Sequence, residues 1–330
     1  MVNYILKKVI GKELIMYDRH RNTAPIADHA DNKKYFVFWS LDNFWKSIPL
    51  KNKHKLKHRI MYVILSLLNP KYILSMNWIS KRESLYKVWT AKNPKSKFIV
   101  VQHGGYVGGF VTDIPHRYTK CDVFLTWGPY FTQQFKGYNG LKNVEILSFG
   151  NPVYNAYNRE VFNYKQSQTR KILLLPTALD EANAKHIYFL INKLKDLNFN
   201  VTLKEHAMQG TSKDAHGNLR FPSIEGVEKI QGNLYHLLQK NDFDLVICDH
   251  SSSLLDAIFF KNKVLYFDPN TNESYKTRYS NYLENLFEQD LENTLSENLY
   301  DFINIPQQES LLKDMIFSGN NVLKNVNQLA

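Results

Sequence analysis

The alternation of short apolar runs with amphipathic segments constrains the fold of this chain more than any other feature. Each run holds four or five apolar residues, as buried strands do, and segments with helical periodicity separate the runs. This order predicts an α/β fold with parallel, doubly wound sheets. The predicted strands are 35–39, 72–76, 98–101, 123–127, 144–148, 171–175, 201–204, 245–248 and 264–267, and the predicted helices are 55–68, 82–91, 183–195, 233–239, one from about 130 and a tail from about 282.

The length of 330 residues suits two domains better than a single core. The alternation lapses in the polar and aromatic segment 151–170, where we place the linker between them. We therefore expect one Rossmann-like domain over residues 1–155 and a second over 170–300. Residues 301–330 are expected to form C-terminal helices that could pack back on the first domain.

The composition describes a folded, soluble protein, with 44% hydrophobic and 22% charged residues. The two cysteines, Cys121 and Cys248, lack metal-site spacing, so we expect buried thiols and a reducing compartment. The N-terminus lacks the pattern of a signal peptide, and the apolar segment 60–68 is too short to span a bilayer. These features predict a cytoplasmic location.

The formal net charge of +11 is concentrated early, in the segment Lys51–Arg59. Such a patch favours anionic partners such as phospholipid headgroups, although it could also be a solvated helix face. No nucleic-acid-binding motif accompanies it, so we expect no nucleic acid as a partner. The patch predicts a peripheral contact with the anionic inner face of the cytoplasmic membrane.

A serine-rich turn follows the predicted strand 245–248, with the sequence Asp249-His250-Ser251-Ser252-Ser253. A new apolar run starts directly after it, which indicates a strand, a tight turn and a helix. The first N–H groups of a helix lack partners within the helix, and with serine hydroxyls beside them they can bind a phosphate. Serines are also ordinary N-caps. Asp256, one helical turn in, could reach a ribose or sugar hydroxyl. It could equally be a first-turn acidic residue that the helix dipole favours.

A glycine-rich segment from Gln102 to Gly109 directly follows the strand 98–101. Ligands bind at the carboxyl ends of strands in open α/β sheets, and glycines allow positive φ and a close approach of the backbone. His103 could act there as a general base, because its unperturbed pKa lies near neutrality. The alternative is a structural histidine bonded to a loop carbonyl.

Two further strand ends carry polar residues. Lys204 could neutralise a phosphate and His206 could donate to the same group, although, taken alone, these residues are better explained as an ordinary charged strand terminus. The turn Pro176-Thr177 ends the strand 171–175, where two-domain α/β enzymes often bind the nucleotide. The D-x-D sequence Asp242–Asp244 precedes its strand and lies at the wrong end of the sheet, so we predict no metal and no cofactor.

With these motifs in place, the chain resembles glycosyltransferases of the GT-B architecture, which have two Rossmann-like domains facing each other across a cleft. The stretch 249–257, followed by 263–267, resembles a signature of teichoic-acid CDP-glycerol glycerophosphotransferases and related capsule transferases. The segment 102–106 is similar to the His-Gly motif of that group, and 149–152 to its Gly-x-Pro turn. Lys204-Glu205-His206 is similar to its Lys-x-His-Pro motif, except that Ala207 replaces the proline.

The resemblance implies a role for each of these residues. His103 would be the catalytic base in an acceptor-side loop in the first domain, and the second domain would bind the donor. The acceptor-side loop would also include Gln102, Gly104, Gly105 and Tyr106. The residues on the donor phosphates would be Lys204, His206, Ser251, Ser252 and Ser253, and those near the donor nucleotide or sugar would be Pro176, Thr177, Asp249 and Asp256.

The leading hypothesis is a metal-independent, inverting glycosyltransferase. It would move a sugar from a nucleotide-sugar donor to a glycan or lipid-linked glycan acceptor of the bacterial surface (capsule, O-antigen or lipooligosaccharide). Transfer of a polyol phosphate from a donor such as CDP-glycerol needs the same phosphate site and remains an alternative. A nucleotide-sugar epimerase shares the architecture. A non-catalytic module that binds an anionic polymer is the alternative outside enzymes.

Overall fold

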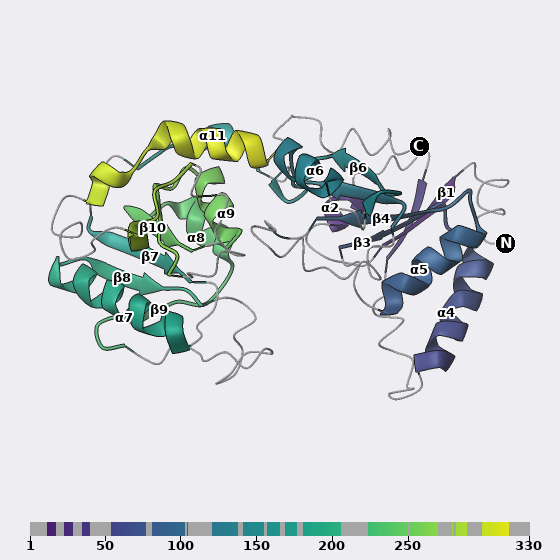
Figure 1. The fold of residues 1–330 in the computed structure, drawn as a ribbon, viewed down its shortest axis with the longest axis horizontal. Helices are drawn as coiled ribbons and strands as arrows, with labels where there is room; N and C mark the ends of the chain where they lie inside the picture. Colours follow the sequence, from purple (N-terminus) through teal and green to yellow (C-terminus); the bar gives the residue numbers. More distant parts are fainter. Residues whose placement is uncertain are drawn as a thin grey trace. The chain divides into compact units, whose positions relative to one another are not determined.

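The structure of the chain is a computed structural model with two compact units, each built around one parallel sheet (Figure 1). The chain passes from the first unit to the second between Tyr157 and Asn158, and returns to the first between Leu312 and Lys313. The structure describes residues 12–17, 23–28, 35–39, 54–76, 81–102, 104, 121–137, 141–154, 157–165, 169–176, 181–205, 224–249, 251–269, 279, 282–288 and 299–316.

The first unit contains a six-stranded sheet in the order β2-β1-β3-β4-β5-β6, with every neighbouring pair parallel. Five of these strands follow the apolar runs that the sequence predicts. The strand that the prediction omits is β1, whose apolar residues 14–17 directly precede Asp18. The strands are β1 (Glu13–Tyr17), β2 (Tyr35–Trp39), β3 (Tyr72–Ser75), β4 (Lys97–Val101), β5 (Val123–Thr126) and β6 (Glu145–Ser148).

Amphipathic helices follow the strands of the first unit. Helix α4 (His54–Leu68) buries Met61 and Leu65 completely, which are one helical turn apart on its inner face. It lies beside α5 (Lys81–Lys92). A hydrogen bond joins the two helices, in which the indole N–H of Trp89 on α5 donates to the hydroxyl of Ser66 on α4 at 3.3 Å. Both helices match the predicted ranges within one residue. The others are α2 (Ala24–Asp28) and α6 (Pro129–Lys136).

The sheet of the second unit has the order β11-β10-β7-β8-β9 and is also entirely parallel. The chain enters it at the centre, builds outward through β8 and β9, and then returns to the other side of β7. Only the two-residue strand β9 lies outside the prediction. The strands are β7 (Lys171–Leu175), β8 (Asn200–Leu203), β9 (Glu228–Lys229), β10 (Leu245–Cys248) and β11 (Val264–Tyr266).

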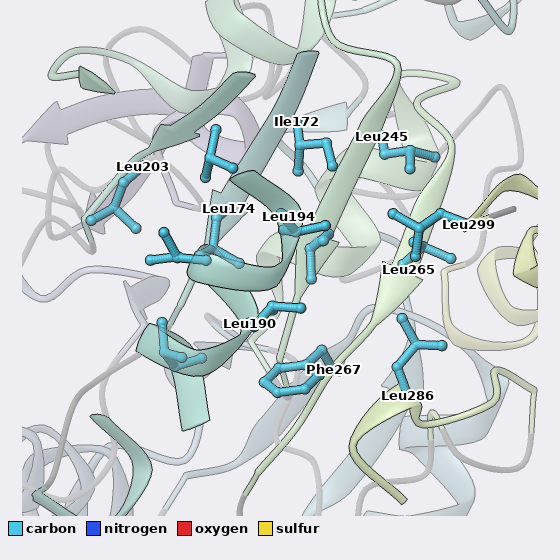
Figure 2. Packing of buried hydrophobic residues seen from close by; sticks show 14 residues of the cluster. Ile172, Leu174, Leu190, Leu194, Leu203, Leu245, Leu265, Phe267, Leu286 and Leu299 are labelled. Atoms are coloured by element: carbon cyan, nitrogen blue, oxygen red, sulfur yellow. The ribbon is translucent and has the colours of Figure 1, made fainter. Parts of the chain in front are cut away.

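The core of the second unit forms where one face of α7 meets the sheet (Figure 2). Leu190 and Leu194 are fully buried and lie in one cluster with Ile172 and Leu174 of β7. Burial of a leucine side chain stabilises a fold by about 1.5 to 3 kcal/mol, so this helix–sheet contact contributes strongly. The helices are α7 (Glu181–Asp196), α8 (Leu234–Lys240), α9 (Ser253–Phe259) and α11 (Ile305–Met315), with 3₁₀ turns at Arg159–Val161, Leu286–Glu288 and Leu299–Phe302.

The predicted helical tail from residue 282 is wrong in part. Asn285 is not helical, because it forms a β-bridge with Tyr266. Its side chain accepts a hydrogen bond from the N–H of Asp268 at 2.9 Å and donates to the Asp268 carbonyl at 3.1 Å. These bonds hold the segment against the edge of the sheet. The predicted loop 209–222 lies outside the described residues.

Glu309 of α11 joins three segments of the second unit. Its carboxylate accepts hydrogen bonds from Arg159 and Lys261, each at 2.8 Å, and from the hydroxyl of Tyr164. Arg159 also donates to the carbonyl of Phe259 at 3.1 Å, at the C-terminal end of α9. Burial alone would raise the pKa of Glu309, but these hydrogen bonds outweigh it and lower the pKa to about 2.

The last residues of α11 belong to the first unit, where Met315 lies against Gly128. A Cβ atom at position 128 would lie 2.4 Å from the carbonyl oxygen of Met315. The backbone of Gly128 is extended, with φ −165°, so any residue could adopt its conformation. Glycine is needed here because only a residue without a side chain allows this close approach.

No helix in the described part of the chain is long and apolar enough to span a membrane.

Candidate functional site

The strand order of the second sheet places its switch point between β7 and β10. The chain moves away from β7 in one direction through β8 and in the other through β10. Ligands of open α/β sheets bind in the crevice outside the carboxyl ends of the strands at such a point, because the loops there diverge to the two faces. Pro176 follows β7 directly, and the serine turn follows β10. The topology therefore brings two of the predicted motifs to one edge.

The serine turn is closed by hydrogen bonds within itself. The carboxylate of Asp249 accepts from the N–H of Ser251 at 3.0 Å, and the hydroxyl of Ser251 accepts from the N–H of Ser253 at 3.3 Å. The N–H of Leu254 donates to the carbonyl of Ser251 at 3.1 Å. The sequence predicts several unpaired N–H groups here, and this is wrong for these three, because the side chains of the turn supply local acceptors.

Ser252 differs from its neighbours in the turn. It is the N-cap residue of α9, yet its hydroxyl caps no N–H group, and its backbone has the right-handed helical conformation with φ −62° and ψ −13°. Among the residues that the structure describes, this hydroxyl has no hydrogen-bond partner. Ser252 is also partly exposed. Its hydroxyl is therefore available to a ligand.

A buried layer lies behind the serine turn. Tyr279 is fully buried, and its hydroxyl donates to the carbonyl of Ser251 at 3.5 Å. Burial, and then the charges of neighbours that include Asp256, raise the pKa of Tyr279 well above its usual value. Asp249 and Asp256 are also buried, with 7% and 4% of their surface exposed. The carboxylate of Asp249 supports the turn through its hydrogen bond from the N–H of Ser251.

Lys204 lies at the carboxyl end of β8, the strand next to β7. Its backbone N–H continues the hydrogen bonding between β8 and β7 by donating to the carbonyl of Leu174 at 3.0 Å. The side chain is half-buried, and burial lowers its pKa. Its neighbour Glu205 pairs with Lys229 at 3.0 Å, but Lys204 itself has no ion pair within the described ranges. A half-buried lysine without a counter-charge favours the binding of an anion.

The strand end before His103 is fixed in the first unit. Gln102 is fully buried, its amide oxygen accepts from the N–H of Trp127 at 2.8 Å, and its carbonyl accepts from the indole N–H of Trp127 at 2.9 Å. These bonds hold Gln102, at the end of β4, against Trp127, at the end of β5. Gly104 does not adopt a positive φ, and a Cβ atom there would meet nothing within 4 Å. The glycine requirement that the sequence predicts is thus not structural at this position.

Several predicted site residues lie outside the described residues: His103, Gly105, Tyr106, Thr177 and His206. Their roles stay predictions.

The D-x-D sequence lies at the amino end of β10, as predicted. The carboxylate of Asp244 pairs with Lys165 at 3.0 Å and accepts hydrogen bonds from the N–H and hydroxyl of Thr169. It is bound to structural partners. Within the described ranges, no three His, Cys, Asp or Glu side chains come together in a group that could hold a metal ion.

Sequence reasoning missed two supporting residues. Tyr279 lies 28 residues after the serine it supports, and Trp127 lies 25 residues after Gln102. Neither is part of a local motif, and the fold brings each pair together from distant positions in the sequence. The two cysteines, in contrast, are free and buried as predicted.

The sequence model of the LIC12162 family transferases matches residues 17–200, more than half of the chain. The chain belongs to this family. The match runs from the end of β1 to the start of β8 and so includes parts of both units. A member of a transferase family is an enzyme, which removes the alternative of a non-catalytic binding module. No curated protein sequence matches this family member.

Solved structures share the fold of this LIC12162 family transferase at low identity. The wall teichoic acid polymerase TagF has a TM-score of 0.56 and 15% identity, over 96% of this chain and 87% of its own. A putative UDP-N-acetylglucosamine 2-epimerase from Listeria monocytogenes has a TM-score of 0.58 and 13% identity, over 96% and 94%. The UDP-GlcNAc 2-epimerase from Methanocaldococcus jannaschii, in complex with UDP-GlcNAc and UDP, has a TM-score of 0.53 and 12% identity, over 96% of this chain and 99% of its own. The predicted fold class, two Rossmann-like domains of the GT-B type, is confirmed.

Proposed function

We propose that this transferase moves a sugar from a nucleotide-sugar donor to a hydroxyl group of a bacterial surface glycan, without a metal ion and with inversion. The observation that carries the proposal is the edge of the second sheet at its switch point. The ends of the adjacent strands β10, β7 and β8 carry Ser252, Pro176 and Lys204 there. Neighbouring strands are about 4.8 Å apart, so the three ends lie within the length of a nucleoside diphosphate.

The donor phosphates would bind Lys204 and the serine turn. The ammonium group of Lys204 and the hydroxyl of Ser252 have no partner among the described residues, so a phosphate would give both side chains an acceptor. Departure of a nucleoside diphosphate leaves negative charge on the phosphates, and preorganised donors stabilise that charge in the transition state. Ser251, Ser253 and His206 would complete the site, with Pro176 and Thr177 beside the nucleotide. The buried Asp249 and Asp256 would hold the turn in place.

His103 would act on the acceptor. As the acceptor oxygen attacks the anomeric carbon, the His103 imidazole takes the proton from the hydroxyl group, and the bond between that carbon and the diphosphate oxygen breaks. The bond pair leaves with the nucleoside diphosphate, so a single displacement inverts the anomeric carbon. Gln102 would position the strand end that carries His103, while Gly104, Gly105 and Tyr106 would let the acceptor approach.

The structural neighbours suggest which donor to test first. The M. jannaschii epimerase was solved with UDP-GlcNAc and UDP, and the epimerase from Neisseria meningitidis, with a TM-score of 0.57 and 11% identity, was solved with UDP-GlcNAc. A UDP-sugar is therefore the first candidate. Membership of a transferase family favours transfer over epimerisation.

Transfer of a polyol phosphate is the second candidate, because the neighbours include the wall teichoic acid polymerase TagF. In that reaction the acceptor oxygen would attack phosphorus, and CMP would leave from a donor such as CDP-glycerol. The same lysine and serine would stabilise the leaving group. The acceptor in either reaction would be a glycan or a lipid-linked glycan.

We also propose that the enzyme works at the inner face of the cytoplasmic membrane. The charge supports this, because the segment Lys51–Arg59 carries only basic ionisable residues and overlaps helix α4, which has no acidic residue. Anionic lipid attracts such segments by about 1 kcal/mol per Lys or Arg.

The test is release of the leaving nucleotide from a panel of UDP-, GDP-, dTDP- and CMP-sugars and CDP-glycerol, with a surface-glycan acceptor and in the presence of EDTA. The proposal expects acceptor-dependent release of the leaving nucleotide from one sugar donor, which is a nucleoside diphosphate or, for a CMP-sugar, CMP. It also expects loss of that turnover in His103→Ala with donor binding retained. Release of CMP from CDP-glycerol alone would favour the second candidate. Turnover that requires a divalent metal, or that His103→Ala retains, would contradict the mechanism.

A further inference from the structure

The outer face of α4 carries an exposed apolar ridge. Leu56, Val63 and Leu67 are 42%, 56% and 48% exposed. Their spacing of seven and four residues places them in one stripe along the helix, opposite the buried Met61 and Leu65. Helix α4 is thus apolar on two opposite faces, and packing against the first unit explains only the inner one.

The neighbouring helix carries a further exposed apolar side chain. Val88 of α5 is 50% exposed, and α5 lies beside α4 (Figure 1). The two helices are joined by the Trp89–Ser66 hydrogen bond, and the ammonium of Lys92 lies 5.6 Å from the ring centre of Tyr62. Among the described residues, five large apolar side chains are exposed, and four of them lie on this pair of helices. The fifth, Val161, belongs to the second unit.

The charge of this region is strongly positive. No Asp or Glu occurs between Asp42 and Glu83, so this stretch carries nine positive charges and no negative one, in a chain whose net charge is +11. Arg59, on α4 beside the ridge, is exposed. The nine basic residues are Lys46, Lys51, Lys53, Lys55, Lys57, Arg59, Lys71, Lys81 and Arg82.

We propose that the α4–α5 face, defined by Leu56, Val63, Leu67, Val88 and Arg59, is a membrane-docking surface in which the apolar ridge enters the headgroup region of an anionic bilayer. A helix with basic residues beside an exposed apolar stripe has the character of interfacial helices that lie in the plane of the membrane. The basic residues attract anionic headgroups, and the ridge removes apolar surface from water. The inference rests on the membrane contact proposed above and extends it from attraction by charge to insertion.

The two contributions predict different responses to salt. Attraction between charges weakens as ionic strength rises, because the Debye length falls from about 10 Å at 0.1 M to about 3 Å at 1 M. Burial of apolar side chains is not screened by salt. Binding through the α4–α5 face should therefore require anionic lipid at low salt, and a residual part should persist at high salt.

The test is flotation of the full-length protein with phosphatidylcholine vesicles, with and without phosphatidylglycerol, at low and high salt. The neutral double variant Val63→Thr/Leu67→Asn reduces the ridge without changing the charge, and we expect it to bind anionic vesicles about tenfold more weakly. Arg59→Glu should also weaken binding at least about tenfold at low salt. The matched controls are Val161→Thr, at an equally exposed apolar position outside the face, and Lys142→Glu, at an exposed basic position outside it. Both should float like the wild type.

The outcomes separate this inference from the rest of the proposed function. If the wild type fails to float with anionic vesicles, both the membrane contact and the docking surface are wrong. If it floats and the double variant floats equally well, the contact is made by charge alone and the ridge inference is wrong. The double variant should keep the wild-type melting temperature and nucleotide binding, which confirms its fold and is independent of the donor chemistry.

Discussion

Trp127 donates two hydrogen bonds to Gln102, one from its backbone N–H to the amide oxygen and one from its indole to the carbonyl, at 2.8 and 2.9 Å. The N–H of Gln102 in turn donates to the carbonyl of Leu125 at 2.9 Å. These bonds fix the end of β4 to the end of β5 in the interior. The residue after Gln102 in the sequence is His103, the proposed base, so the pair fixes the backbone that directly precedes it.

Replacement of Gln102 by methionine should destabilise the protein. The change keeps the length of the side chain but removes the acceptor of the Trp127 N–H, and a buried donor without a partner costs about 1 to 3 kcal/mol. Urea unfolding should show this loss. Gln133→Met, on the exposed face of α6, is the matched control and should be neutral. Equal stabilities of the two variants would contradict the role of the pair.

Substitution of two glycines by alanine should have different effects on stability. Gly128→Ala introduces a Cβ atom 2.4 Å from the Met315 carbonyl oxygen, so α11 must shift and stability should fall by about 1 to 3 kcal/mol. Gly104→Ala meets nothing within 4 Å and should melt like the wild type. Thermal unfolding distinguishes them. If Gly104→Ala folds normally but loses turnover, a substrate approaches the backbone there. A loss of stability in Gly104→Ala would contradict the open space found around this residue.

The Glu309 cluster predicts a pH dependence of stability. The folded-state pKa of Glu309 is about 2, below the usual value of 4.5, so its contribution is present above about pH 4.5 and is lost as the pH falls toward 2. Glu309→Gln should therefore reduce the free energy of unfolding at pH 7, by about 1 to 2 kcal/mol for a partly exposed cluster. The difference in the free energy of unfolding between variant and wild type should disappear in acid. Denaturant unfolding at a series of pH values measures this difference, and a difference that is constant with pH would contradict the low pKa of Glu309.

Much of the fold follows from the sequence, because most of its strands are buried on both faces and are therefore continuously apolar. The run 171–175 and the run 245–248 match β7 and β10 residue for residue. Strand β1 lies outside the prediction although its residues 14–17 are equally apolar. Strand β9 has two exposed residues and carries no signal of its own.

The site was predictable only in part, for a physical reason. The sequence identifies residues that follow strands, such as Lys204 and Ser252, because the carboxyl ends of parallel strands share one edge. It does not give the strand order, so the switch point between β7 and β10 appears only in the structure. The sequence also does not reveal which polar groups bind each other, such as the carboxylate of Asp249 and the N–H of Ser251.

The central claim, an anion site built by Lys204 and Ser252, is tested most directly by thermal stabilisation with UDP, GDP, dTDP, ADP, CDP and CMP, with and without EDTA. A ligand of the native state raises its melting temperature by mass action. We predict stabilisation by one of these nucleotides that EDTA does not change, and a nucleotide affinity about 10 to 100 times lower in Lys204→Ala. Ser252→Ala should weaken binding as well, whereas Lys240→Ala, exposed at the end of α8, should not. Stabilisation by no nucleotide, or equal stabilisation of the Lys204→Ala variant and the wild type, would contradict the account.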